Sequence, residues 1–321
     1  MNDKLKALLG ATGVLLALAA SAADDSPTRI LVGFPPGGGS DLIARLVAER
    51  MRATLGTTVV VENRPGANGS LAAEALKNAN PDGKTLMVSP IGVSVFAPLT
   101  HAKLRFDPFT DFAPVSLAAT FEVALAVGPG TPAKTLGEYV AWVRANPGKG
   151  AYGIPVAGGP SHFFAVTFGR AAGIDFTAVP YKGGPPMVGD LMGGQVPAAV
   201  TSFADLLPQH QAGRIRILAV SGTQRPAVAP EIPTFKELGY ASIEGSGWQA
   251  FHTTAGTPRA VVDRLGAAVA DALRAPEVRD RLTAVGLQPV GSTPDELARR
   301  MSEERERWAP VVKATGFRAD Q

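Results

Sequence analysis

The sequence predicts an α/β fold made of two lobes that face each other. Short apolar strands alternate with helices, and two strand–helix junctions, at residues 34–41 and 155–162, are rich in glycine. A βαβαβ order produces a parallel sheet with right-handed crossovers, so ligands are expected beyond the carboxyl ends of its strands. Glycines let backbone N–H groups approach a ligand, and a helix N-terminus adds unsatisfied donors and a positive dipole end. Each junction is therefore predicted to bind a small anion.

The first α/β series occupies the amino-terminal third of the chain. Apolar runs indicate the strands, a turn-rich loop covers residues 63–69, and Ser70 is expected to cap the helix that follows. We expect strands at residues 30–34, 58–62 and 85–89 and helices at residues 41–55 and 70–78. The glycine loop at residues 34–41 and the segment at residues 89–92 then lie at the same edge of the sheet.

A further strand is expected at residues 122–127, and a second βα series begins after the segment at residues 128–132 and leads into a helical carboxyl-terminal part. Thr257 and Pro258 are expected to cap and open one helix, and residues 293–296 form a capping-box pattern before another that reaches about Ala314. Ser161 and His162 open a helix directly after the second glycine loop. We expect strands at residues 122–127, 152–154 and 215–220 and a helix at residues 136–146.

The first residues have the composition of a secretory signal peptide. Lys4 and Lys6 precede an apolar run at residues 7–20, and Ala20-Ser21-Ala22 has the small-x-small pattern of a cleavage site. The run is shorter than the roughly 20 residues that span a bilayer, which disfavours the alternative of a retained anchor. We therefore expect residues 1–23 to be removed near Ala22 or Ala23 and the product to be exported.

Composition excludes several classes of function. The chain has 321 residues and no cysteine, so a thiolate zinc site and a cysteine nucleophile are ruled out and stability must rest on the hydrophobic core. That length suits two domains. The formal net charge is only +3 and the basic residues are dispersed, so no nucleic-acid partner is expected.

The glycine loop at residues 34–41 fits none of the nucleotide-binding patterns. No Gly-Lys-Ser/Thr follows Gly37–Gly39, and the spacing is not GxGxxG, so neither a P-loop nor a dinucleotide cofactor is expected. A plain flexible turn is the alternative. Asp41 is interpreted as a helix-start residue that orients the loop, or a ligand's amine, rather than as a catalytic base.

No motif indicates catalysis or a metal. The four histidines are scattered, and no GxSxG elbow or Ser-x-x-Lys pair occurs, although a triad assembled in space stays open. His162 is interpreted as a structural residue, with a ligand-side donor as the alternative. Lys182 could pair with an anion or be a solvated loop residue, and Trp248 could belong to the core, the hinge or the cleft wall.

The chain resembles the solute-binding receptors of tripartite tricarboxylate transporters, often called Bug proteins, over nearly its whole mature length. The segments that carry the resemblance are FPPGGGSDLIAR (34–45), VVVENRPGANGS (59–70), PDGKTL (81–86), FDPFTDFAPVS (106–116), VPYKGGPPMVGDLMGGQVPAAV (179–200), RILAVSGTQR (216–225), PTFKELGY (233–240), AGTP (255–258) and GSTPDEL (291–297).

This resemblance implies a type II periplasmic binding protein fold, in which two hinged lobes close over a ligand. Lobe one would comprise residues 24–124 and 246–321 and lobe two residues 125–245. The product would be a periplasmic monomer and not an enzyme. It would bind a small organic carboxylate and work with the membrane subunits of the transporter, with no cofactor or metal. The expected ligand-binding residues are Phe34, Pro36, Gly37, Gly38, Gly39, Ser40, Asp41, Ser89, Pro90, Ile91, Gly92, Val156, Ala157, Gly158, Gly159, Pro160, Ser161, His162, Tyr181, Ser202, Phe203 and Asp205.

One departure from the family pattern concerns the second glycine loop. This loop often carries several Ser or Thr residues in the family, but here none precedes Ser161. We expect a ligand with an apolar or aromatic body and one carboxylate rather than a citrate-like ligand. Two rival functions stay open: an exported hydrolase on the same scaffold, and a ligand sensor that passes its closed state to a membrane kinase.

Overall fold

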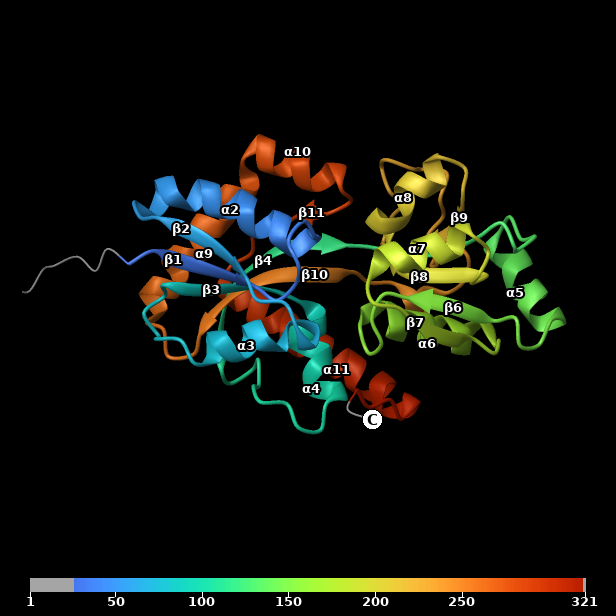
Figure 1. The fold of residues 1–321 in the computed structure, drawn as a ribbon, viewed down its shortest axis with the longest axis horizontal. Helices are drawn as coiled ribbons and strands as arrows, with labels where there is room; N and C mark the ends of the chain where they lie inside the picture. The colour runs from blue at the N-terminus through green and yellow to red at the C-terminus, as the bar shows by residue number, and fades with distance from the viewer. Residues whose placement is uncertain (1–25, 320–321) are drawn as a thin grey trace, which may run out of the picture.

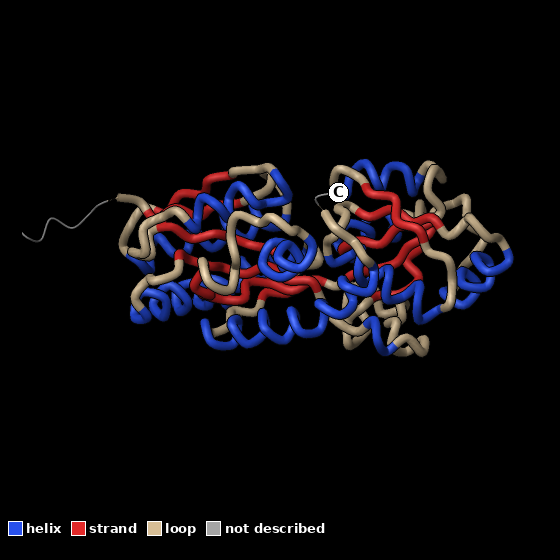
Figure 2. The backbone as a smooth tube through the Cα atoms, turned by 90° about the horizontal axis from the view of Figure 1, so that it is seen from below, coloured by secondary structure: helices blue, strands red, loops and turns tan. Residues whose placement is uncertain are grey.

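The computed structural model describes residues 26–319, so the predicted signal peptide lies outside the described residues. These residues form two α/β lobes side by side, each built on one β-sheet with helices on both faces (Figures 1 and 2). The two-lobed fold that the sequence predicts is therefore confirmed. Within the described range, no helix is long and apolar enough to cross a membrane.

The first sheet has six strands in the order β11-β4-β10-β3-β1-β2. Its first three strands in sequence are parallel, whereas β10 pairs antiparallel with both β3 and β4. The strands are β1 (Thr28–Val32), β2 (Val59–Asn63), β3 (Thr85–Pro90), β4 (Phe112–Phe121), β10 (Gly247–Thr254) and β11 (Gln288–Pro289). The helical segments of this part are α2 (Gly39–Leu55), η1 (Ala67–Gly69), α3 (Ser70–Lys77), η2 (Gly92–Phe96), α4 (Ala97–Thr100), α9 (Arg259–Arg274), α10 (Pro276–Ala284) and α11 (Pro294–Thr315).

The second sheet has five strands in the order β7-β6-β8-β5-β9. Here β6 is parallel to β7 and β8, and β5 is antiparallel to β8 and β9. The strands are β5 (Val123–Val127), β6 (Ala151–Ile154), β7 (Thr177–Pro180), β8 (Ala198–Ser202) and β9 (Arg216–Val220). The helices are α5 (Leu136–Ala145), α6 (Pro160–Ala172), α7 (Gly184–Met192) and α8 (Phe203–Gln211), and η3 (Ala241–Ile243) lies on the path back to the first sheet.

The connections between the sheets bring the carboxyl ends of their parallel strands toward each other. Only Glu122 separates β4 from β5, and the chain returns through residues 221–246 into β10. At this junction the end of β4 pairs with the start of β10, and the start of β5 pairs with the end of β8. Because β3 and β8 both end at this edge, the loops after β1, β3, β6 and β8 occupy the facing ends of the two lobes (Figure 1).

Helix α11 packs on the first sheet and reaches the second lobe. Its Trp308 ring lies 5.0 Å from that of Phe164 on α6, and Arg170 Nη2 donates to the carbonyl of Ala314 at 2.9 Å. One continuous apolar core consequently contains side chains of both sheets and of this helix. The lobe boundaries expected from the sequence stay a prediction, but they assign to lobe one a helix that contacts both lobes.

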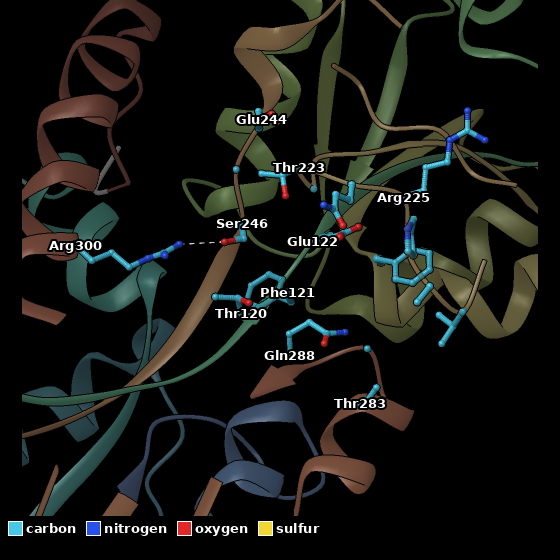
Figure 3. Close-up of a pocket in the computed structure, with 18 of the residues that line it drawn as sticks. Thr120, Phe121, Glu122, Thr223, Arg225, Glu244, Ser246, Thr283, Gln288 and Arg300 are labelled. Atoms are coloured by element: carbon cyan, nitrogen blue, oxygen red, sulfur yellow. Dashed lines mark hydrogen bonds between the residues drawn. The ribbon is translucent and has the colours of Figure 1, made fainter. Parts of the chain in front are cut away.

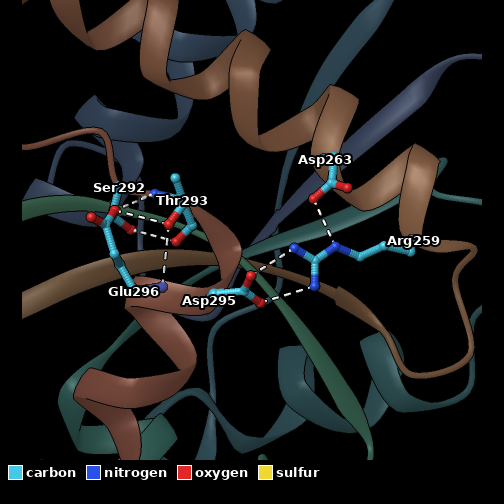
Figure 4. Close-up of polar contacts among 6 residues, drawn as sticks. All are labelled: Arg259, Asp263, Ser292, Thr293, Asp295 and Glu296. Carbon is cyan, nitrogen blue, oxygen red and sulfur yellow. Dashed lines mark hydrogen bonds and ion pairs between the residues drawn. The ribbon is translucent and has the colours of Figure 1, made fainter.

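The start of α11 carries the capping box that the sequence predicts. Thr293 Oγ1 accepts the Glu296 N–H at 3.3 Å, and Glu296 Oε2 accepts the Thr293 N–H at 2.8 Å (Figure 4). Beside it, Arg259 of α9 forms a bidentate pair with Asp295 at 2.9 and 2.8 Å and a bond to Asp263 at 2.8 Å. These bonds join the first turns of two helices and lower the pKa of Asp295.

Two predicted helix caps are wrong. Thr257 Oγ1 donates to the carbonyl of Thr254 at 2.7 Å, and Pro258 is the N-cap residue of α9. Ser70 is the first residue of α3, and Gly69, with a φ of 94°, is its N-cap. Neither α3 nor α9 therefore has a side-chain hydrogen bond at its N-cap.

Candidate functional site

The first glycine loop is stabilised by a buried carboxylate. Gly37 has a φ of 89°, and its N–H donates to Asp41 Oδ2 at 2.9 Å. Arg45 Nε donates to the same oxygen at 2.9 Å, and Asn63 Nδ2 donates to Oδ1 at 2.9 Å. Burial alone would raise the pKa of Asp41, but these three bonds together with the Arg45 charge hold it below its usual range. Asp41 therefore orients the loop, as one of the two sequence interpretations states.

Several backbone donors of this loop have no acceptor within the helix that follows it. The Leu42 N–H makes the first intrahelical bond of α2, to the Gly38 carbonyl at 2.9 Å. The N–H groups of Gly39, Ser40 and Asp41 precede that bond and have no intrahelical acceptor. Residues 35–39 are exposed. The positive end of the helix dipole and these donors suit the arrangement to an anion.

The second glycine loop repeats this geometry with different chemistry. Gly158 has a φ of 74°, and its N–H donates to His162 Nδ1 at 3.2 Å, the same four-residue contact as in the first loop. The N-cap residues Gly38 and Gly159 have nearly equal dihedral angles, with ψ values of 172° and 179°. Accepting this bond requires a neutral His162, and burial lowers its pKa. The structural interpretation of His162 is the one that this geometry supports.

The second loop offers fewer donors than the first. Pro160 has no N–H, and the His162 N–H bonds the Gly159 carbonyl at 3.1 Å, which leaves the Ser161 amide. The hydroxyl of Ser161 has no hydrogen-bond partner within residues 26–319. Gly158 and Gly159 are buried, unlike their counterparts in the first loop. This side of the site is accordingly the less polar one.

The residues predicted to bind the ligand after β3 have few side-chain groups available for it. Ser89 and Ile91 are fully buried, and Ser89 Oγ lies 2.6 Å from Ser94 Oγ. Pro90 and Gly92 are partly exposed, as is Phe34, whereas Pro36 is exposed. Neither Ser89 nor Ile91 therefore reaches solvent in this structure.

The side chains of the predicted residues in lobe two also make contacts within the protein. Tyr181 donates its hydroxyl to Asp190 Oδ2 at 2.9 Å, and burial together with this bond and the Asp190 charge raises the pKa of Tyr181 to about 12. Ser202 accepts the Ala204 N–H as the cap of α8, and Phe203 belongs to the core. Asp205 accepts from Thr201 Oγ1 at 2.8 Å. Part of the Asp205 side chain reaches solvent, yet the surrounding protein raises the pKa of its carboxyl group.

The structure brings predicted segments of the two lobes together. Phe96, on η2 just after residues 89–92, stacks on Phe163 beside the second glycine loop at 5.2 Å. On the opposite side Gly286, which precedes β11, packs against Ala204 of α8 so closely that an added Cβ would lie 2.8 Å from the Ala204 methyl. The loops at the facing ends of the lobes therefore form one continuous region.

A cavity of about 760 Å³ lies where the chain crosses between the lobes (Figure 3). Among the sequence-predicted residues only Phe203 lines it. Its lining includes Glu122, whose Oε2 is buried without a hydrogen-bond partner and whose pKa burial raises to about 7. Sequence reasoning missed Glu122, because a single acidic residue between two apolar strands carries no motif.

Gln249 is a second residue that the sequence reasoning missed. Its Oε1 accepts from Ser40 Oγ at 2.9 Å, which links β10 to the first turn of α2. The only signal was a polar amide inside an apolar run after Trp248. No cluster of three or more potential metal-ligating side chains occurs in the part of the chain that the structure describes.

Comparisons with known proteins agree with this geometry. A sequence model described as "Tripartite tricarboxylate transporter family receptor" matches residues 43–317. Protein BugT of Bordetella pertussis is 32% identical over 96% of this chain and 97% of its own length. Among solved structures, Rpa4515 of R. palustris with adipate is 31% identical, with a TM-score of 0.83 over 91% of this chain and 98% of its own. MatC of Rhodopseudomonas palustris with bound malate is 32% identical, with a TM-score of 0.79 over 89% of this chain and 98% of its own.

Proposed function

Because this chain belongs to the receptor family of the tripartite tricarboxylate transporters, a family of periplasmic solute-binding proteins, we propose that it captures a small organic carboxylate between its two lobes. It delivers this ligand unchanged to the membrane subunits of such a transporter. The precursor loses residues 1–23 on export, and the mature receptor acts as a monomer.

The observation that carries this proposal is the N-terminus of α2, which follows directly on the exposed residues 35–39. The three N–H groups from Gly39 to Asp41 precede the first intrahelical bond and have no acceptor within the helix, and the buried Asp41 carboxylate holds the loop in place. Charge-assisted bonds from backbone amides are strong, and a rigid loop loses little entropy on binding. Relatives with adipate and with malate bound support a carboxylate as the ligand class.

We assign the carboxylate to the first loop and an apolar or aromatic body to the second. Pro160 removes one backbone donor there, and Val156 and Ala157 present only apolar side chains. A ligand with one carboxylate needs no further charge compensation at its far end. Closure of the lobes is favoured because only the closed state contacts the ligand from both sides.

The direct test removes from the first loop the backbone donor that the second loop lacks. Gly39→Pro reproduces the residue of the second loop, and proline is well tolerated at the first helical position after an extended residue such as Gly38. A Cβ at Gly39 would meet only Leu287 Cδ1 at 3.6 Å, an ordinary contact. We expect this variant to fold as the wild type does and to lose at least tenfold in carboxylate affinity.

The measurement is calorimetric titration with benzoate, adipate, malate and citrate. Pro160→Gly, which adds a donor to the second loop, is the matched control and is expected to improve binding of adipate and malate relative to benzoate. Tight citrate binding together with silent aromatic monocarboxylates would contradict the assignment of an apolar ligand body. Turnover of any of these acids would contradict the receptor function itself.

A further inference from the structure

Gln249 occupies a place at which a side chain can reach a ligand held by the first glycine loop. We propose that the side-chain amide nitrogen Nε2 of Gln249 donates a hydrogen bond to a carboxylate oxygen bound at the N-terminus of α2. Lobe one then holds both oxygens of the carboxylate before the lobes close. This inference rests on the proposed carboxylate-binding function.

Side-chain alternation along β10 directs Gln249 toward α2. Phe251 packs in the core with Ile43 and Val47 of that helix, whereas Trp248 and Ala250 pack in the core on the other face of the sheet. Gln249 is on the same face as Phe251, and its bond to Ser40 shows that it lies under the first turn of α2.

The strand register places Gln249 at the end of lobe one that faces lobe two. It is the third residue of β10 and pairs with Pro90, the last residue of β3. The glycine loop at residues 34–41 and the segment at residues 89–92 therefore both border this side chain. Both segments are among those that the sequence predicts to contact the ligand.

The bond with Ser40 uses the amide oxygen of Gln249 and leaves its Nε2 without a protein acceptor. Because Oε1 of Gln249 accepts from the Ser40 hydroxyl, the orientation of the amide is set and Nε2 points elsewhere. Nε2 has no hydrogen-bond acceptor among residues 26–319, and although only 9% of the Gln249 surface is exposed, this atom still reaches solvent. A donor that reaches solvent and has no protein acceptor is free to bond an oxygen of a ligand.

A carboxylate oxygen is the acceptor that the surroundings favour. The amides of Gly39 to Asp41 and the dipole of α2 attract an anion to the same place, and the nearby guanidinium of Arg45 is already paired with Asp41. A neutral amide donor adds a hydrogen bond there without a buried charge that would need its own partner.

The test compares Gln249→Glu with Gln249→Met in the full mature receptor, titrated with benzoate and with adipate. Gln249→Glu keeps an oxygen acceptor for the Ser40 hydroxyl but replaces the donor with a negative group. We expect at least a hundredfold loss of affinity for both acids.

Gln249→Met, which has similar length and no donor, should lose about tenfold if Nε2 contributes a hydrogen bond. Melting temperatures in the absence of ligand show whether each variant is folded. Unchanged affinity of folded Gln249→Glu would overturn the inference, and a loss confined to adipate would do the same by placing Gln249 at the distal group. If the wild type binds neither acid, the proposed function fails instead.

Discussion

The two glycine loops have the same backbone geometry but differ in the chemistry that stabilises them. In each, a glycine with positive φ donates its N–H to a side chain four residues later, but that side chain is an ionised carboxylate in one loop and a neutral imidazole in the other. Residues 35–39 of the first loop are exposed, whereas in the second loop Gly158 and Gly159 are buried, Gly158 lies against Phe317, and Pro160 removes one donor. The difference teaches that one backbone motif can serve as an anion site or as an apolar wall.

The largest difference between the loops is expected from their anchoring side chains. Asp41→Asn replaces one acceptor by a donor that faces either both Arg45 and the Gly37 N–H or the amide of Asn63, so it should lower the free energy of unfolding by about 3 kcal/mol and abolish ligand binding. His162→Asn, the matched change, should cost about 1 to 2 kcal/mol because only one hydrogen bond is affected. Urea denaturation measures both. Equal losses would show that the charge of Asp41 adds nothing.

The equivalent glycines should respond differently to a methyl group. A Cβ at Gly158 would lie 2.6 Å from Phe317 Cε1, whereas one at Gly37 meets nothing within 4 Å. Both positions have positive φ, which costs about 1 kcal/mol or more for alanine. We therefore expect Gly37→Ala to destabilise the protein by about 1 kcal/mol and Gly158→Ala by about 2 to 3 kcal/mol. Thermal unfolding checks the order, and the reverse order would refute the packing argument.

Acidification should weaken the second loop before the first. The pKa of His162 is lowered in the folded protein, so its contribution to stability is complete above the usual histidine pKa and is lost as the pH falls below it. The pKa of Asp41 is also lowered, so its contribution is present above the usual aspartate pKa and is lost only as the pH falls through its folded value.

The check is the melting temperature of the wild type and of His162→Gln between pH 8 and pH 5. His252 also changes the stability in this window, because burial lowers its pKa to about 4 in the folded protein whereas the unfolded residue protonates near the usual histidine pKa, and this effect is the same in both proteins. The difference between the two curves therefore isolates His162. We expect the wild type to lose stability faster on acidification, and parallel curves would show that His162 does not titrate on unfolding.

The smallest expected effect concerns the free hydroxyl of the second loop. Ser161→Ala should lower the affinity for adipate or malate by about two- to fivefold, because one neutral hydrogen bond is worth about 1 kcal/mol at most there. Benzoate, which has no second polar group, should bind unchanged. Calorimetry distinguishes the two, and an equal loss for benzoate would place its carboxylate at the second loop.

Several elements could be predicted because their signals are local. The capping box at Thr293 and the strands before both glycine loops depend on residues close in sequence, and the structure has them within two residues of the expected bounds. The strands β4 and β10 were missed, because both faces of β10 are buried and its sequence has no period of two. Gln249 lies in the same strand and was missed for the same reason, and its hydrogen-bond partner Ser40 is remote in sequence.

The sequence by itself determined the two strand–glycine–helix junctions and the side chain that anchors each loop. Those contacts join residues four apart, so the local chain specifies them before the protein folds. Only the tertiary structure decided which donors stay free: it brought Gln249 of β10 under α2 and Phe317 against Gly158. Such contacts depend on strand register and on the path of α11 between the lobes, and no short-range pattern encodes them.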